Sequence, residues 1–275
     1  MAGDLLEEVA YLPGSYSVQY GRMLGGLVDL RTKKKLPERS NGSLSVDLFQ
    51  TALFVEQRVG DRDAVTFAGR RSYADVVLNP ILNKGSLTVQ APRYYDGQLR
   101  WSRKLDNGWN DVLFLMSDDR FRFVGQGDDE AVLAGIVTQF QKFRWLHERK
   151  IGNDLSLKTS VVFGPEKKFF ENDNASEAYE KEMRVSARLQ IAQPMRPDRN
   201  FGWMIGTDPN FNHSSFLYAI DKPPERSVTT SRVASTESGK FNIWQPSLFG
   251  EVSVRAGDAT ITPGVRADMQ VVESS

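Results

Sequence analysis

Apolar and polar residues alternate along most of this chain. Residues 182–191 are the clearest case, because their odd-numbered positions are all apolar and their even-numbered positions all polar. A period of two predicts a β-strand with one apolar face and one polar face. The same alternation recurs at residues 42–50, 96–103, 154–163, 247–255 and 260–271.

Other stretches are less decisive. Residues 109–123 and 133–149 also favour strands, but their mixed composition does not assign their faces. Residues 2–12 could form a short helix or a strand, because their spacing is helical but Pro13-Gly14 ends the stretch after about three turns. From residue 41 onward the pattern predicts about ten strands.

The connections between these strands alternate in length. Turn-forming sequences occur at residues 60–63, 106–108, 152–154, 194–200 and 257–258, and longer polar connections lie near 79–93, 124–132, 164–178 and 208–242. The spacing leaves strands of roughly 15 residues, more than the 9–11 that cross a bilayer. Short turns at one rim and long loops at the other are typical of an up-and-down membrane barrel. Strands of a soluble sandwich are shorter, about 5–6 residues.

Composition narrows the chemistry. The chain has no Cys and two His, which removes thiol nucleophiles, disulfides and an ordinary zinc site. Its 35 basic and 35 acidic residues balance, so no global charge favours nucleic acid. No run of 18 apolar residues predicts a transmembrane helix. The first residues show no signal-peptide pattern.

Residues 11–35, YLPGSYSVQYGRMLGGLVDLRTKKK, do not follow the strand rhythm. They resemble the end of the plug domain of TonB-dependent outer-membrane receptors, where a PG…YGR…GG…V…TK run leads into the first barrel strand. The matching residues are Pro13, Gly14, Tyr20, Gly21, Arg22, Gly25, Gly26, Val28, Thr32 and Lys33. Weaker likenesses to barrel strands of that family cover residues 67–78, 94–121 and 259–269.

The resemblance implies an all-β fold: part of a large antiparallel up-and-down transmembrane β-barrel, preceded by the C-terminal end of a plug domain. Residues 1–38 would be the plug end, and residues 39–275 the first part of the barrel, with about ten strands. The family's barrels have about 22 strands and a whole plug. We therefore expect this chain to be a truncated piece that does not close a barrel by itself.

The family likeness also implies a function. It predicts a receptor and transporter in the outer membrane of a Gram-negative cell, not an enzyme, that takes up a scarce nutrient such as a ferric siderophore, cobalamin or a glycan. Its partners would be outer-membrane lipid, a TonB-type energy-transducing complex and a small-molecule or glycan ligand, but no nucleic acid. The alternatives are a porin-like barrel, a soluble all-β carbohydrate-binding module, and an outer-membrane barrel enzyme such as a lipase.

No catalytic, cofactor or metal-binding constellation is visible, and the substrate-binding residues are unknown. Arg70–Arg71 and Asp118–Asp119 are interpreted as rim or lumen-wall charges with ligand contact as the alternative. Lys33–Lys35 favour a solvated linker, and Asp128–Glu130 a solvated loop. His147 is placed in a strand and His213 in a long loop, and neither has a neighbouring His or Cys.

Two arginines help to assign the two faces of the strand predicted at residues 182–191. A guanidinium that faces hydrocarbon costs several kcal/mol, so Arg184 and Arg188 must face water or a partner. In a plugged barrel that space is the lumen, and we expect both side chains to pair there with plug carboxylates. Met183, Val185, Ala187, Leu189 and Ile191 would then face lipid.

Overall fold

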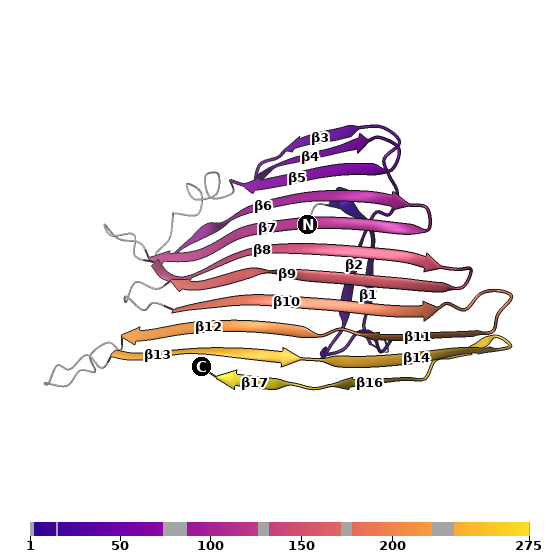
Figure 1. Cartoon of the computed structure of the whole chain (residues 1–275). Coiled ribbons are helices and arrows are strands. Elements are labelled where there is room, and N and C mark those ends of the chain that lie inside the picture. The colour runs from indigo at the N-terminus through magenta and orange to yellow at the C-terminus, as the bar shows by residue number, and fades with distance from the viewer. Residues whose placement is uncertain are drawn as a thin grey trace, which may run out of the picture.

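The protein is one broad antiparallel sheet with a small hairpin against one face. The computed structural model describes residues 3–14, 16–73, 87–125, 132–171, 178–221 and 234–274. Figure 1 shows the long strands lying side by side, with the hairpin running across them. None of the described residues forms a helix that is long and apolar enough to cross a membrane.

The hairpin comes first in the chain. A single 3-10 turn, Gly3–Leu5, leads into β1 (Leu6–Leu12), which pairs antiparallel with β2 (Leu27–Thr32). Residues 2–12 therefore take the strand alternative, after one turn of helix. Leu5 is buried against Phe54 and Ala68 of the large sheet.

The large sheet contains all the later strands. Eight are unbroken: β3 (Asn41–Val46), β4 (Gln50–Val59), β5 (Asp63–Ser72), β6 (Leu87–Leu105), β7 (Gly108–Gly125), β8 (Val132–Ile151), β9 (Leu155–Glu171) and β10 (Ala178–Gln193). The others are shorter: β11 (Phe201–Thr207), β12 (Asn210–Asp221), β13 (Ala234–Gln245), β14 (Ser247–Ala256), β15 (Ala259–Ile261), β16 (Gly264–Asp268) and β17 (Val271–Ser274).

The shorter strands combine into long ones. β11 and β12 both pair with β10, β13 and β14 continue each other beside them, and β15, β16 and β17 together form the last edge. Each long strand lies beside its neighbours in sequence, which is up-and-down connectivity. In the described residues β3 and the β15–β17 strand are the two ends of the sheet, so it does not close. The predicted all-β antiparallel fold is confirmed.

The three composite strands break at one level of the sheet. The first breaks at Asp208-Pro209, the second at Pro246 and the third at Met269-Gln270. Register pairs Asn210 with Gln245 and Ser247 with Asp268, so the breaks are adjacent. Proline has no N–H to give to a sheet ladder, which explains two of the interruptions.

The turns agree with the sequence, but the strands are longer than predicted. Residues at all five predicted turns lie between strands. β6 to β10 have 16 to 20 residues each. Strands occupy most of the predicted connection 164–178 and both ends of 208–242, although these sequences do not alternate regularly. Residues 74–86, 126–131, 172–177 and 222–233 lie outside the described residues.

Register assigns a face to every strand, including the two whose composition left it open. One row of directly paired residues crosses eight neighbouring strands and is apolar throughout: Phe67, Leu99, Phe114, Phe143, Phe163, Val185, Phe211 and Trp244. Leu99 is 50% exposed and Phe67 is 43% exposed. Among the described residues, no protein layer covers the face that carries this aromatic row, which is called the outer face below. The hairpin lies on the other, inner face.

Candidate functional site

The polar side chains of the inner face meet the hairpin at two places. Each place centres on one carboxylate, and we name each group after it. The Asp208 cluster comprises Arg22, Arg188, Asp208, Arg266 and Asp268. The Asp111 cluster comprises Arg100, Asp111 and Arg144.

The Asp208 cluster lies where the composite strands break. Asp208 is between β11 and β12, and Arg266 of β16 approaches its Oδ1 to 2.6 Å. Arg188 of β10 donates to Asp208 Oδ2 at 3.0 Å. The Ser247 hydroxyl also donates to Asp208, whose backbone N–H donates to the Ser247 Oγ at 3.1 Å. The break frees Asp208 from the ladder, so its side chain can serve several donors.

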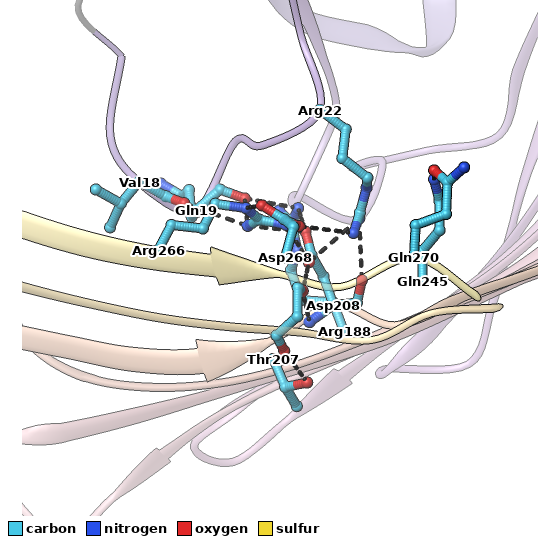
Figure 2. A network of polar contacts seen from close by, with 11 residues as sticks. Val18, Gln19, Arg22, Arg188, Thr207, Asp208, Gln245, Arg266, Asp268 and Gln270 are labelled. Carbon is cyan, nitrogen blue, oxygen red and sulfur yellow. Dashed lines mark hydrogen bonds and ion pairs between the residues drawn. The ribbon is translucent and has the colours of Figure 1, made fainter.

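The hairpin enters this cluster through Arg22. Its guanidinium donates to Asp268 Oδ1 at 3.1 Å and to the Asp208 carbonyl at 3.0 Å (Figure 2). Arg22 has a φ of 59°, in the left-handed region that side chains other than glycine rarely adopt. The ion pairs with the sheet hold a backbone conformation that is otherwise unfavourable.

The backbone of the hairpin is held as well. Arg188 donates to the Gln19 carbonyl at 3.0 Å and Arg266 to the Val18 carbonyl at 3.3 Å. The Val18 N–H donates to Glu251 at 3.2 Å. Three strands therefore bind backbone groups of two consecutive hairpin residues, Val18 and Gln19.

Gly21 allows this close approach. A Cβ at Gly21 would lie 1.9 Å from Arg266 Nε, which is impossible without moving the guanidinium. By contrast, a Cβ at Gly25 would meet no atom within 4 Å. Contact with the sheet therefore explains why a glycine is needed at position 21, but it does not explain the glycine at position 25.

Tyr20, the first residue of the YGR run, packs beside the cluster. Its ring centroid is 5.9 Å from the Arg188 guanidinium carbon, and its hydroxyl donates to Asp29 at 3.3 Å. Burial, with a further contribution from Asp29, raises the pKa of Tyr20. The phenol therefore stays protonated and acts as a donor across the hairpin.

The Asp111 cluster lies at the other end of the hairpin. The Asp111 side chain is fully buried, and Arg100 Nε donates to it at 2.5 Å. Arg144 binds its other oxygen at 2.8 Å. Arg100 also donates to the Lys33 carbonyl at 2.5 Å, and Arg144 to the Thr32 hydroxyl at 3.3 Å. The end of β2 is thus tied to β6, β7 and β8 through the two arginines.

The charges proposed from the sequence as rim or wall residues do not form one site. Consecutive strand residues point to opposite faces, so Arg70 is inner and Arg71 outer. Arg70 donates to Asp96 at 2.8 Å across the inner face, whereas Gln139 donates to Asp118 at 2.6 Å on the outer face. Neither adjacent pair acts together, and Asp119 lies on the inner face.

The remaining candidates have ordinary partners. Lys34 pairs with Glu148 at 2.5 Å and Lys35 with Glu38 at 2.9 Å. His213 lies in β12, not in a loop as predicted, because the strand is longer than its polar sequence indicates. His147 bonds Asn110 and His213 bonds Asn242, each across a strand pair.

Asp128–Glu130 lie outside the described residues. Within the described ranges, no group of three or more His, Cys, Asp or Glu residues could hold a metal ion.

Arg184 and Arg188 lie on the inner face as predicted, but among the described residues neither pairs with a carboxylate of the hairpin. Arg188 binds a hairpin carbonyl, and Arg184 binds Glu182 of its own strand at 2.5 Å. Sequence reasoning did not single out Arg100, Asp111 or Asp208. No local pattern marks them, because their partners come from other strands.

This geometry defines a class of protein: a wall of long up-and-down strands that is apolar outside and charged inside, with a hairpin bound to the charged side. Two solved structures have this fold. The ferric-catecholate import receptor Fiu from E. coli K12, in its open form, has a TM-score of 0.70 and 11% identity, and the match covers 98% of this chain and 50% of that one. The siderophore receptor PiuA from Acinetobacter baumannii has a TM-score of 0.63 and 9% identity, with 98% and 51% covered.

The fold is therefore that of the TonB-dependent siderophore receptors, as the sequence resemblance implied. This chain spans about half the length of the two solved structures. No family model and no curated protein matches its sequence.

Proposed function

We propose that this chain is part of a TonB-dependent outer-membrane receptor that takes up a scarce nutrient by an energised mechanism. The observation that carries the proposal is the attachment of the hairpin to the inner face by the Asp208 and Asp111 clusters. A transporter that opens by moving an internal plug needs contacts that are strong enough to close the pore and polar enough to be exchanged for water.

In this proposal residues 1–38 are the end of the plug and residues 39–275 the first part of a larger barrel. The separate pairing of β1 with β2, and the start of the large sheet at Asn41, support that division. The outer face supports a position in the outer membrane, because the aromatic row would face hydrocarbon.

Ferric siderophores are the first substrate class to test, since Fiu and PiuA are siderophore receptors. The energy-transducing partner would be a TonB-type complex. The alternatives are less well supported. A porin has no need of a bound hairpin. A soluble carbohydrate-binding module would bury the aromatic row, and transport by a receptor requires no catalytic group.

The test is uptake by cells that carry the complete protein. A catecholate siderophore loaded with radioactive iron should enter these cells, and a protonophore should abolish its entry. Arg22→Gln, which removes the charge that joins the hairpin to Asp208 and Asp268, should lower energised uptake. Arg31→Gln is the matched control, since Arg31 pairs only with Glu8 and Asp29 of the hairpin itself.

Uptake that continues in the presence of the protonophore would indicate a porin. Recovery of the protein from the soluble fraction would indicate a soluble module. A normal surface level with no siderophore uptake would redirect the search to another nutrient and leave the receptor class standing. An Arg22→Gln protein with wild-type uptake would remove the role assigned to the Asp208 cluster.

A further inference from the structure

A second row of the outer face differs from the aromatic row. Four residues further along β5 to β10, toward the rim opposite the short turns, directly paired positions cross the six strands. They are Arg71, Tyr95, Asp118, Gln139, Lys167 and Lys181. Arg93 and Arg120 pair with each other two residues beyond Tyr95 and Asp118. The charged side chains of the outer face therefore begin about 13 Å along the strands from the aromatic row.

The cations here lack anionic partners. We call Arg71, Arg93, Arg120, Lys167 and Lys181 the outer basic patch. Within the described parts of the chain, none of the five has an ion pair with a carboxylate. The Nε atoms of Arg93 and Arg120 are buried without a hydrogen-bond acceptor. Arg71 and Arg93 instead lie 5.4 and 5.3 Å from the centroid of the Tyr95 ring.

The inner face treats its arginines differently. Arg100, Arg144, Arg188 and Arg266 each contact Asp111 or Asp208. A buried guanidinium donor without an acceptor is costly, and Arg144 Nε also lacks one, so the inner arginines differ by their carboxylate partners. In the outer basic patch, Arg71, Lys167 and Lys181 are exposed and have no carboxylate partner among the described residues, so an anion from outside the chain can pair with them.

The opposite margin of the outer face gives an internal comparison. Four residues from the aromatic row toward the short turns, the paired positions on β5 to β10 are Asp63, Arg103, Asn110, His147, Thr159 and Leu189. There Arg103 pairs with Asp63 at 3.8 Å, and His147 bonds Asn110 at 2.8 Å. At that margin Arg103 therefore has a carboxylate partner, although Asp63 Oδ1 accepts no hydrogen bond and Arg149 has no ion pair among the described residues.

A groove joins the patch to the apolar band. Its volume is about 270 Å³, and its lining includes Tyr95, Met116, Asp118, Gln139 and Lys167. Met116 is 47% exposed on the apolar side, and Lys167 stands at the charged side. Asp118 accepts from Gln139 through Oδ2, while its Oδ1 is buried without a donor. An apolar floor with a cationic margin suits a molecule with a hydrocarbon part and a phosphate.

We propose that the outer basic patch binds the phosphate group of a membrane lipid, whose acyl chain lies along Met116 in the groove. The guanidinium groups of Arg93 and Arg120 would donate to the phosphate oxygens, and Lys167 would add a point charge. This proposal rests on the membrane position given under the proposed function, but it does not depend on which substrate is transported. It predicts selectivity for anionic lipid on this side of the wall.

The test measures lipid binding to the complete protein, purified in detergent and stripped of lipid. Native mass spectrometry would count bound dihexanoyl phosphatidic acid, with dihexanoyl phosphatidylcholine as the zwitterionic comparison and inorganic phosphate as the free anion. Wild-type protein should bind phosphatidic acid at least tenfold more tightly than phosphatidylcholine. The double variant Arg120→Gln, Lys167→Gln should lose that preference.

The matched control is Arg103→Gln, Arg149→Gln, which removes the same charge from the opposite margin and should keep the preference. If the patch double variant does not fold, each of its single substitutions should reduce the preference in part. Equal binding of the two lipids by wild-type protein, or an unchanged preference in the folded patch variants, would overturn the proposal. So would competition by inorganic phosphate at the concentration at which phosphatidic acid binds, because the site would then recognise a free anion.

Discussion

The two carboxylates that hold the hairpin lie in different surroundings. The Asp111 side chain has no exposure and that of its partner Arg100 has 3%, whereas Asp208 is 7% exposed and Arg22 is 23% exposed. Arg100, Asp111 and Arg144 all come from the sheet, on neighbouring strands. The Asp208 cluster takes Arg22 from the hairpin itself. One cluster is therefore part of the wall, and the other is a contact between wall and hairpin.

This difference predicts different roles. The Asp111 cluster persists without the hairpin, which adds only the Lys33 carbonyl and the Thr32 hydroxyl to it. The Asp208 cluster loses a cation when the hairpin leaves, but water reaches it and can replace that cation. We expect the Asp208 end to release first and the Asp111 end to stay attached.

The largest effect should come from Asp111→Asn in the complete protein folded in lipid vesicles. The substitution leaves Arg100 buried without its counter-charge, and breaking a buried pair in this way costs about 3–5 kcal/mol. Urea titration would measure the free energy of unfolding. Asp106→Asn, at an exposed turn, is the control and should be nearly neutral. A loss below about 1 kcal/mol would show that the Asp111 cluster is not structural.

Asp208→Asn should have a smaller global effect and a larger local one. Hydrogen bonds to charged groups contribute roughly 1.5–3 kcal/mol, and here water can compensate part of the loss. Amide hydrogen exchange over residues 16–26 should accelerate, while exchange in β6 to β8 should stay unchanged. Equal acceleration in both regions would mean that the two clusters form one cooperative unit, which would break the comparison.

A matched pair of glycines tests the fit at the Asp208 cluster. Gly21→Ala would push a methyl group into Arg266, and overpacking of this kind costs about 1 kcal/mol or more. Gly25→Ala has free space and should have no measurable effect. Thermal melting and exchange over residues 16–26 would compare the two. Identical behaviour of the two variants would show that Arg266 is not held in place by its carboxylate partners.

The sequence predicted the wall better than the contacts. Alternation over residues 182–191 placed Val185 outside and Arg188 inside, because side-chain direction in a strand depends on local order alone. The Asp208 cluster depends on register between strands and on the path of the hairpin. No window of the sequence contains that information. The full length of β9 and β12 was also missed, because the residues near their ends are polar and are held in the strands by pairing with neighbouring strands.

The smallest expected effect concerns a third group of charges, at the short-turn rim. Its ion pairs are open to solvent, so they give a reference value against which the ion pairs of the two clusters can be compared. Asp154 pairs there with Arg199 at 2.6 Å and with Arg196 at 3.0 Å. The hydrogen bond from Arg199, with the charges of both arginines, lowers the pKa of Asp154. A carboxyl with a lowered folded-state pKa stabilises the fold above its unfolded pKa and loses that contribution as pH falls through the folded value.

Wild-type protein should therefore be slightly more stable than Asp154→Asn at pH 7, and the difference should vanish below the lowered pKa. Urea titrations of both proteins between pH 7 and pH 2 would measure it. High salt should also reduce the difference, since the pair is open to solvent. A stability difference that remains at the lowest pH would show that Asp154 acts through packing at the turn. The ion pairs at this rim would then give no reference value for those that hold the hairpin.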